Sequence, residues 1–530
     1  MKKKRVIVSE RIAEEGIALL KTELDVDYQD GISRQELLSI IDQYDALIVR
    51  SVTQVDEELV SRGKNLKVVG RAGNGIDNID VDVCTRYGII VANTPDSNTI
   101  SAAEQTISLL LSSVRNTAWA SHYLKEVKWD RKPFRGVELY GKTVGIVGLG
   151  RIGSMVATRL KAFNMRVLAY DPYISEQRFE RFGVEKVDTL EDLMKEVDFL
   201  TVHTPRNEET MHMINEDMFA LAKDGIRIVN CARGGIIKEE AILRGLRSGK
   251  IASAGLDVFE KEPAEANPLF EFNTVVVTPH LGADTFEAQK RVGETIAEQV
   301  IKALRGEIVP NVVNLPTMVS EELNYLKPYI ILAEKMGMFY YQMAKAPLGR
   351  VDLTYSGPVT MNETEMLTVA FLRGLLHPVL AEKVNYVNAR LMADERGIAI
   401  YEHKEAQSPK RYKNLISAKM FNHDYSLELA GTLSRARNPL LVEINGYETE
   451  NDLEGYVIIV KNEDRPRVIG PFATALGDAG VNIASMKTAR KAKGDIAIML
   501  LNVDNKAEED VLESLGKLDG IVGKPRLLYF

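Results

Sequence analysis

A glycine-rich turn near residue 150 places the strongest limit on the fold of this chain. Gly148, Gly150 and Gly153 have the spacing G-x-G-x-x-G, directly after the β-branched run KTVGIV and at the start of a helical stretch. Asp171 follows the next apolar run, VLAY. Such glycines let backbone N–H groups approach a pyrophosphate at a helix N-terminus, and the aspartate accepts hydrogen bonds from ribose hydroxyls. Because a carboxylate repels a 2′-phosphate, the pattern predicts binding of NAD rather than NADP.

Short apolar runs separated by helical stretches predict an α/β fold with two doubly wound parallel sheets. The first set of expected strands is Arg5–Val8, Ala46–Arg50, Lys67–Arg71 and Ile89–Asn93. The second set is Thr143–Gly148, Arg166–Tyr170, Phe199–His203, Arg227–Cys231, Ser253–Val258 and Thr274–Thr278.

The remaining patterns predict how the domains follow one another. Ser101 and Glu104 form an S-x-x-E capping box, which predicts the start of a helix linking the two sheets. A helical stretch from His280 to about Arg305 is long enough to return to the first sheet, and Val309–Pro316 is typical of a linker. We expect a substrate-binding domain at 1–97 completed by 285–310, an NAD-binding domain at 98–284, an intervening α+β domain at 311–452 and a C-terminal module at 453–530. The order strand, helix, strand, strand, helix, strand predicts a ferredoxin-like fold for that module.

Composition excludes several classes of protein. Hydrophobic residues make up 45% and charged residues 27% of the 530 residues, which excludes a largely disordered chain. The net charge is −8, with no basic run beyond Lys2–Arg5, so no nucleic-acid partner is expected. No apolar stretch is long enough to span a membrane. With only Cys84 and Cys231, a disulfide framework is excluded, and we expect a cytoplasmic enzyme or sensor without a metal.

Three residues with complementary chemistry follow strands of the second set. Arg233, Glu262 and His280 come after three of its last expected strands, at the edge where such sheets bind ligands. Arginine provides a planar fork for a carboxylate, and histidine takes a hydroxyl proton as hydride leaves. A carboxylate beside the histidine orients its ring. The joint pattern predicts a 2-hydroxy acid dehydrogenase.

The motifs GLGRIG, NCARGGII, AGLDVFEKEP and TPHLGADT, in this order, resemble those of the D-isomer-specific 2-hydroxyacid dehydrogenases. GRAGNGIDNID, NTPDSNTISAAE and WDRKPF narrow the resemblance to the D-3-phosphoglycerate dehydrogenases of the long form, which carry an intervening domain and an ACT domain. The resemblance covers the whole chain. It implies NAD-dependent oxidation of 3-phospho-D-glycerate to 3-phosphohydroxypyruvate, the first step of L-serine biosynthesis, by a homodimer or homotetramer.

The resemblance also implies site residues. Arg233, Glu262 and His280 are implied as catalytic, and Asp257 as the residue that holds the nicotinamide carboxamide. The implied cofactor contacts are Asn74, Gly148, Gly150, Arg151, Ile152, Gly153, Asp171, Thr204, Cys231, Ala232, Asp257, Gly282 and Ala283. The implied substrate contacts are Arg50, Arg71, Asn74, Gly75, Arg131, Arg233 and His280.

The ACT module departs from its family at one position. Asn462, Asp464 and Asn482 match positions that contact a serine effector in such modules. Arg467 replaces the glycine that usually permits the turn beside that ligand. We therefore expect serine inhibition to be weak.

Three alternatives remain open at this stage. The chain could oxidise another acid, such as glycerate or 2-hydroxyglutarate. It could be a non-enzymatic dinucleotide sensor, although a sensor does not need the arginine, glutamate and histidine together. The C-terminal modules could serve only as contacts between subunits.

Overall fold

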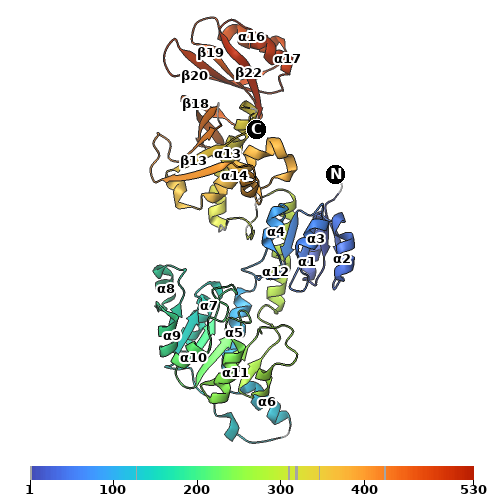
Figure 1. Ribbon diagram of the computed structural model, residues 1–530, viewed down its shortest axis with the longest axis vertical. Coiled ribbons are helices and arrows are strands. Elements are labelled where there is room, and N and C mark those ends of the chain that lie inside the picture. Colours follow the sequence, from blue (N-terminus) through green and yellow to red (C-terminus); the bar gives the residue numbers. More distant parts are fainter. Residues whose placement is uncertain are drawn as a thin grey trace.

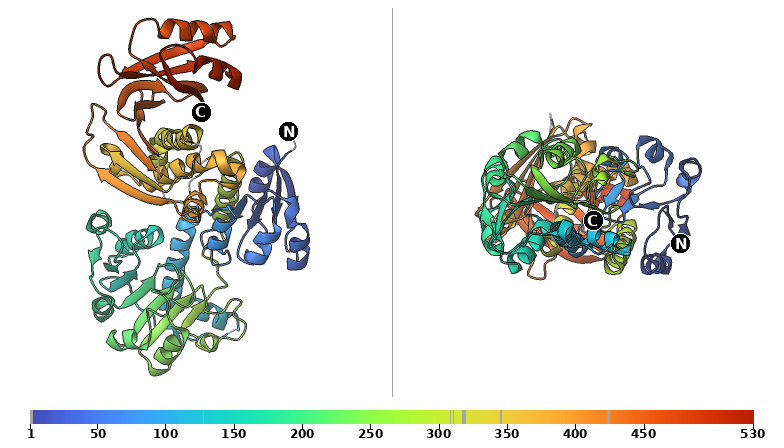
Figure 2. Two further views of the ribbon diagram at one scale, coloured as in Figure 1. Left: turned by 45° about the horizontal axis from the view of Figure 1, so that its top comes forward. Right: turned by 90° about the horizontal axis from the view of Figure 1, so that it is seen from below.

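Four β-sheets follow one another along an elongated molecule. The computed structural model describes residues 3–126, 128–307, 309, 311–316, 320–344, 346–422 and 425–530. Lys2 of the basic run and Pro310 of the expected linker lie outside the described residues. Figure 1 shows the second sheet at the lower end, the last sheet at the upper end and the first sheet at the side. The left view in Figure 2 shows the same arrangement, and the right view, along the long axis, shows the first sheet to one side of the others.

The first sheet is entirely parallel, as the apolar runs predict. In spatial order its strands are β2 (Asp25–Tyr28), β1 (Arg5–Val8), β3 (Ala46–Val49), β4 (Val68–Arg71) and β5 (Ile90–Ala92). Its helices in this part of the chain are α1 (Glu14–Glu23), α2 (Arg34–Ile40), η1 (Ile41–Gln43), α3 (Glu57–Arg62) and α4 (Val81–Arg86). The edge strand β2 was not predicted, because its sequence DVDY has no apolar run.

The second sheet is also parallel and has the expected doubly wound order. Its strands are β12 (Val275–Val277), β11 (Ile251–Leu256), β10 (Ile226–Asn230), β9 (Phe199–Val202), β6 (Thr143–Val147), β7 (Arg166–Tyr170) and the unpredicted edge strand β8 (Glu185–Lys186). The helices are α5 (Thr99–Val114), α6 (Thr117–Lys125), η2 (Lys132–Phe134), α7 (Arg151–Ala162), α8 (Glu176–Phe182), α9 (Leu190–Glu196), α10 (Glu216–Leu221), α11 (Glu239–Ser248) and η3 (Pro268–Glu271).

The predicted capping box at the start of α5 is wrong. The helix begins at Thr99, and Ser101 lies inside its first turn, where its hydroxyl donates to the carbonyl of Asn98. Glu104 pairs instead with Arg159 on α7. The buried small side chains of this first turn pack into the protein, so tertiary contacts rather than a capping side chain determine where the helix starts.

Helix α12 (Phe286–Leu304) returns to the first sheet, as predicted. It packs on α1 and β4. A Cβ atom on Gly16 of α1 would lie 2.6 Å from the carbonyl oxygen of Gly293, so glycine is required for this close crossing. A helix from the middle of the chain therefore covers strands from the beginning of the chain.

The described part of the expected linker pairs with the first sheet. Val312 forms an antiparallel bridge with Ala92 at the end of β5. The side chain of Asn314 donates to Thr85 and to the carbonyl of Ile89, and it accepts from the N–H of Val91. This segment is thus fixed to the sheet edge.

The third and fourth sheets make up the rest of the chain. The third has the order β14 (Ala399–Glu405), β13 (Arg350–Ser356), β15 (Leu415–Phe421), β16 (Ser426–Leu433), β17 (Pro439–Ile444) and β18 (Tyr447–Asp452), with α13 (Ser320–Met343), η4 (Pro358–Met361), α14 (Glu365–Leu380), η5 (Ala381–Lys383) and α15 (Ala389–Asp394). The fourth has the order β20 (Ile483–Arg490), β21 (Ile496–Val503), β19 (Tyr456–Glu463) and β22 (Ile521–Tyr529), with α16 (Ile469–Asp478) and α17 (Glu509–Leu515). The fourth has the predicted ferredoxin-like order.

These last two sheets share one hydrophobic core. Val457, Ile459 and Leu500 from the fourth sheet belong to the same buried cluster as Leu332 and Phe371 from α13 and α14. The expected boundary at 452/453 stays a prediction, and the cluster shows that the two sides of it are packed together.

Candidate active site

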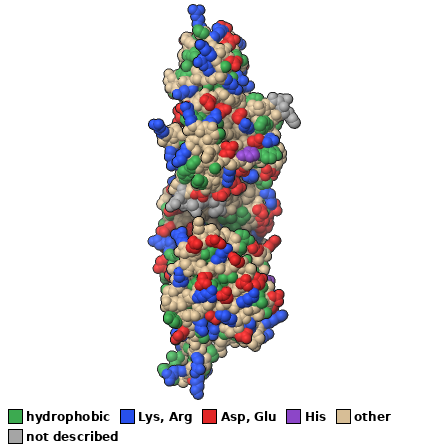
Figure 3. All heavy atoms as spheres, turned by 90° about the vertical axis from the view of Figure 1, so that its left-hand side faces the viewer, with side chains coloured by type: hydrophobic (Ala, Val, Ile, Leu, Met, Phe, Trp, Pro, Cys, Tyr) green, Lys and Arg blue, Asp and Glu red, His purple; other side chains and the backbone are tan. Residues whose placement is uncertain are grey.

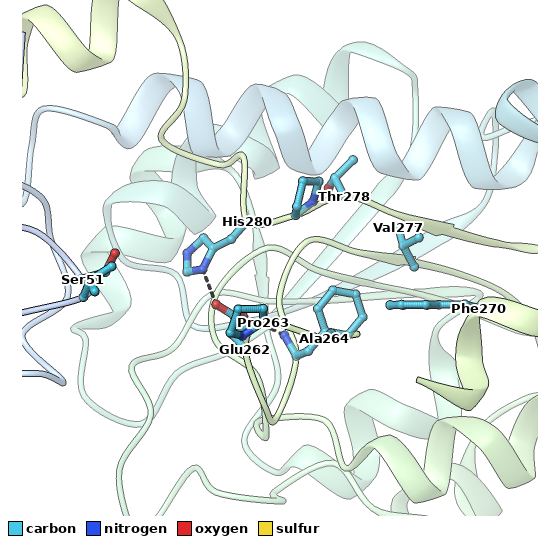
Figure 4. Close-up of a pocket in the computed structure, with 11 residues that line it drawn as sticks. Ser51, Glu262, Pro263, Ala264, Phe270, Val277, Thr278 and His280 are labelled. Carbon is cyan, nitrogen blue, oxygen red and sulfur yellow. Dashed lines mark hydrogen bonds and ion pairs between the residues drawn. The ribbon is translucent and has the colours of Figure 1, made fainter. Parts of the chain in front are cut away.

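His280 and Glu262 meet at the carboxyl edge of the second sheet. Nδ1 of His280, three residues beyond β12, lies 2.8 Å from Oε2 of Glu262, in the loop after β11 (Figure 4). If Nδ1 donates its hydrogen to the carboxylate, Nε2 is the nitrogen left to accept a proton from a substrate. The half-exposed ring can therefore act as a base held in one orientation.

The Glu262 carboxylate is suited to remain ionised. Its partial burial acts to raise its pKa, but hydrogen bonds from His280 and from the N–H of Phe259 outweigh this effect, so the pKa is lowered. An ionised carboxylate at this position stabilises the positive charge that His280 acquires when it takes a proton.

Arg233 reaches from the second sheet toward the loop after β4. Its Nε lies 3.4 Å from Asp77, and its Nη1 donates to the carbonyl of Ala232. A Cβ atom on Gly75 would lie 2.1 Å from Nη2 of Arg233, so the glycine leaves the space that the guanidinium occupies. Asp77 was missed by the sequence reasoning, although it follows Gly75 by two positions in the same motif.

Arg71 is partly buried and forms a positive cluster with Arg233 and Arg50. A Cβ atom on Gly73, which has φ of 146°, would lie 1.7 Å from Nη1 of Arg71. Burial, together with the nearby charges of Arg233 and Arg50, lowers the pKa of Arg71 to about 10. Its Nε is buried and has no hydrogen-bond partner in the part of the chain that the structure describes. A multiply charged anion would supply the missing acceptor and offset the repulsion between the three guanidinium groups.

Two other predicted substrate contacts, Asn74 and Arg131, differ in their surroundings. The carbonyl of Asn74 accepts from the side chain of Asn93, which fixes the loop that carries Gly75. Arg131 is exposed and precedes η2, and no described hydrogen bond or ion pair joins it to the arginine cluster. Its assignment stays a prediction.

A cavity of about 630 Å³ is lined in part by His280 and Glu262. Its lining combines residues after β11 and β12 with two residues after β3 of the first sheet (Figure 4). The lining residues are Ser51, Val52, Phe259, Glu262, Pro263, Ala264, Phe270, Val277, Thr278, Pro279 and His280. A substrate bound here would touch both sheets.

The glycine-rich turn has the geometry that a dinucleotide needs. Gly148 has φ of 92°, and a Cβ atom on Gly153 would lie 2.1 Å from the carbonyl oxygen of Gly148. Apart from Gly150 itself and its neighbours in the chain, no described atom lies within 4 Å of where a Cβ atom on Gly150 would be, just before α7 begins. The buried hydroxyl of Thr204 has no hydrogen-bond partner among the described residues. The open helix N-terminus and this free polar group fit a pyrophosphate-containing cofactor.

Asp171 lies against this turn. Its Oδ2 accepts from the N–H of Leu149 at 2.9 Å, and its Oδ1 accepts from the N–H of Tyr173 at 3.0 Å. The carboxylate therefore carries its charge directly beside the turn. Arg151, the first residue of α7, pairs with Asp96 at 2.8 Å, and Ile152 follows it in the same turn.

Asp257 holds the segment 280–282 in place through hydrogen bonds. Its fully buried carboxylate accepts from the N–H groups of Leu281 and Gly282, both at 2.8 Å, and from the hydroxyl of Thr278. Its carbonyl accepts from the N–H of His280. The contact of Asp257 with a nicotinamide carboxamide, like those of Cys231, Ala232 and Ala283 with the cofactor, stays a prediction.

The ACT positions are partly engaged within the chain. Asp464 accepts from Arg490 and from the N–H of Gly494, and Asn482 donates to Asp504. Asn462 is buried, and within the described ranges its side-chain oxygen has no hydrogen-bond partner. Arg467 has φ of 71°, so the position retains the left-handed conformation that favours glycine.

The described residues contain neither a membrane-spanning helix nor a metal-binding group: no helix among them is both long and apolar enough to cross a membrane, and no group of three or more His, Cys, Asp or Glu could hold a metal. Both cysteines are free and buried. Figure 3 shows acidic and basic side chains mixed over the face it presents.

Three family models match successive parts of the chain. Residues 107–282 match the NAD-binding domain of D-isomer specific 2-hydroxyacid dehydrogenases, and residues 325–445 match the D-3-phosphoglycerate dehydrogenase intervening domain. Residues 456–520 match the ACT domain. The matched regions lie inside the second, third and fourth sheet regions, respectively.

Relatives that match almost the whole chain are named D-3-phosphoglycerate dehydrogenase. The D-3-phosphoglycerate dehydrogenase of Methanocaldococcus jannaschii is 43% identical over 517 residues, and that of Archaeoglobus fulgidus is 43% identical over 522 residues, with 98% of both chains covered in each case. A crystal structure of D-lactate dehydrogenase from Aquifex aeolicus, in complex with NAD and lactic acid, is 30% identical with a TM-score of 0.53 and covers 59% of this chain and 100% of its own. Identity of this extent over complete chains shows that the chain belongs to the D-3-phosphoglycerate dehydrogenase family.

Proposed function

We propose that the chain oxidises 3-phospho-D-glycerate to 3-phosphohydroxypyruvate with NAD, the reaction that opens L-serine biosynthesis. The observation that carries this proposal is the His280–Glu262 pair, whose side chains lie 2.8 Å apart and line a cavity. The charge of Arg233 acts on Glu262, and Arg233 and Arg50 both act on Arg71, so the surroundings of the pair are positive. A base next to a strongly positive site suits a hydroxy acid that carries both a carboxylate and a phosphate.

The residues divide the work as follows. Arg233 and the backbone N–H groups near Asn74 hold the substrate carboxylate. Arg50 and Arg71 hold the phosphate, and Arg131 is a further candidate. His280 takes the C2 hydroxyl proton on Nε2, while Glu262 stabilises the resulting imidazolium.

The turn Gly148–Gly153, with Asp171 and Thr204, would hold the cofactor. When bound there, NAD supplies the nicotinamide that accepts hydride from C2. Asp257 keeps the segment after β12 in place through its hydrogen bonds to Leu281 and Gly282. These contacts support the proposal that His280 takes the proton at the edge of the sheet where the cofactor would bind.

Regulation, assembly and location complete the proposal. The ACT domain indicates a small-molecule ligand, for which we propose serine at Asn462, Asp464 and Asn482. We propose that the chain assembles as a homodimer or homotetramer and works in the cytoplasm. We also propose four domains, at 1–97 completed by 285–310, 98–284, 311–452 and 453–530. Two free cysteines support a reducing compartment.

Steady-state NADH formation tests the function. We expect rapid turnover of 3-phosphoglycerate and a kcat/KM for unphosphorylated glycerate lower by about 10²-fold or more, because the arginine cluster then lacks its phosphate. Equal use of glycerate would mean that another acid is the substrate. Absence of NADH with every acid would favour a dinucleotide sensor.

A further inference from the structure

Glu10 lies where β1 ends and accepts four consecutive backbone hydrogen bonds. Its carboxylate receives the N–H groups of residues 50 to 53, the loop after β3, at 2.9, 3.1, 3.1 and 2.9 Å in order. The residue is only 9% exposed. All four N–H groups of this loop therefore point inward at one internal anion.

The opposite side of the loop is fixed as well. The buried side chain of Asn78 donates to the carbonyls of Arg50 and Thr53, at 3.0 and 2.6 Å. The hydroxyls of Ser9 and Thr53 are 2.9 Å apart. The loop is thus tied at its N–H groups and at its carbonyls.

This loop is the part of the first sheet that faces the catalytic pair. Ser51 and Val52 line the cavity together with Glu262 and His280, and Figure 4 shows Ser51 across the opening from His280. Arg50 lies at the start of the loop and close enough to Arg71 for the two charges to interact. The position of the loop therefore sets where the first arginine of the cluster stands.

Consecutive N–H groups that converge form a concavity that binds anions. Here the carboxylate of Glu10 fills this concavity. Burial acts to raise the pKa of Glu10, but the hydrogen bonds from the loop outweigh burial, so the pKa is lowered. Without that carboxylate, four donors near a site for an anionic substrate would be left unpaired. They would either reorient the loop or draw the substrate anion away from the arginines.

We propose that Glu10 is a positioning residue for substrate binding, an internal anion that holds the loop 50–53 so that Arg50 faces the substrate phosphate. The inference rests on the proposed function, since that function gives Arg50 its role. Glu10 itself does not touch the reacting atoms.

Two variants test the proposal in the full-length enzyme. Glu10→Gln keeps the shape but places an amide donor against the loop donors, so we expect the KM for 3-phosphoglycerate to rise about tenfold. The kcat, the KM for NAD and the kcat/KM for glycerate should change by less than about threefold. In Glu10→Ala, sodium formate should lower the raised KM, and sodium chloride at the same ionic strength should not.

Asp45→Asn is the matched control. Asp45 accepts from Lys4 and from the N–H of Arg5 just before β3 begins, so it anchors the same strand at its opposite end. It should alter thermal stability without changing the KM for 3-phosphoglycerate.

Three results would overturn the role of Glu10. They are an unchanged KM in Glu10→Gln, a parallel rise in the KM for NAD, and no effect of formate on a folded Glu10→Ala enzyme. Loss of the proposed function is a separate outcome, because it would show as absence of 3-phosphoglycerate oxidation by the unmodified enzyme.

Discussion

Oε2 of Glu262 lies 2.8 Å from Nδ1 of His280, although the two residues follow different strands. The contact forms because β11 and β12 are neighbours in the sheet, so that both carboxyl ends reach the same edge. The chemistry of the site depends on this contact.

Replacement of the base should remove turnover and spare cofactor binding. We expect His280→Asn to lower kcat by about 10²–10⁴-fold, because asparagine cannot take the hydroxyl proton as a general base. Asparagine tolerates the φ of 56° at this position. Steady-state kinetics and fluorescence titration with NADH measure the two effects.

His212→Asn is the control for that variant. His212 also has a positive φ, 55°, and also pairs with a carboxylate, Glu260 at 3.2 Å, but it does not line the cavity. Its turnover should stay within about threefold of the parent. A His280→Asn enzyme of near-normal turnover would assign the base elsewhere.

Replacement of the neighbouring carboxylate should change both turnover and acid stability. We expect Glu262→Gln to lower kcat by about 10²-fold. Because the pKa of Glu262 is lowered in the folded protein, its contribution to stability is present above the unfolded value of about 4.3 and is lost as pH falls through the folded value. The unfolding midpoint of the parent should therefore fall more steeply below about pH 4 than that of the variant. Parallel curves would contradict this assignment.

Replacement of the carboxylate-binding arginine should damage substrate use. We expect Arg233→Lys to lower kcat/KM for 3-phosphoglycerate by about 10²-fold, because an ammonium cannot replace a planar fork. Arg227→Lys, at the start of the same strand β10, is the control and should change kcat/KM little. Unchanged kinetics of Arg233→Lys would refute its role.

Replacement of Asp171 should shift cofactor preference. We expect Asp171→Ala to lower the NAD to NADP ratio of kcat/KM by about 10- to 100-fold, through loss of ribose hydrogen bonds and of repulsion of the 2′-phosphate. Asp171→Asn keeps an acceptor for the N–H of Leu149 and should show the effect of charge alone. Asp224→Ala, at an exposed site before β10, is the control. An unaltered ratio would mean that Asp171 does not face the ribose.

The response to serine should depend on Arg467. We expect weak inhibition of the parent and stronger inhibition of Arg467→Gly, because glycine adopts the φ of 71° without the roughly 1 kcal/mol that a side chain costs. Arg437→Gly, which relieves a similar φ of 65° outside the ACT domain, should leave the response unchanged. Tight inhibition of the parent, or no gain in Arg467→Gly, would exclude this explanation.

The central strands could be predicted because their residues are apolar on both faces. All four residues of β3, Ala46–Val49, are buried, and such runs are visible in sequence. The edge strands β2 and β8 could not be predicted, because Asp25–Tyr28 and Glu185–Lys186 carry charges and have only one neighbouring strand each.

The positions of Arg233, Glu262 and His280 at the ligand edge could be predicted because each follows a strand that ends there, and their catalytic roles stay predictions. The hydrogen bonds of Glu10 and Asp257 that hold the surrounding loops could not be predicted from the sequence. Glu10 is about forty residues from the N–H groups that it accepts, and a single glutamate after a strand gives no sign of them. Asp257 was assigned to the cofactor by its motif, whereas its hydrogen bonds to Leu281 and Gly282 depend on the folded loop.

The return of α12 to the first sheet also determines the order in which a growing chain can fold. Val292, Ile296 and Val300 of α12 complete the core that covers Val6 and Val68. During translation these strands leave the ribosome long before α12 does, so the part of their apolar face that α12 buries stays uncovered while the whole second sheet is being synthesised. The second sheet has all its strands before α12 emerges. We therefore expect the region made first to be among the last to reach its native packing, with a chaperone-binding surface exposed on the nascent chain in the meantime.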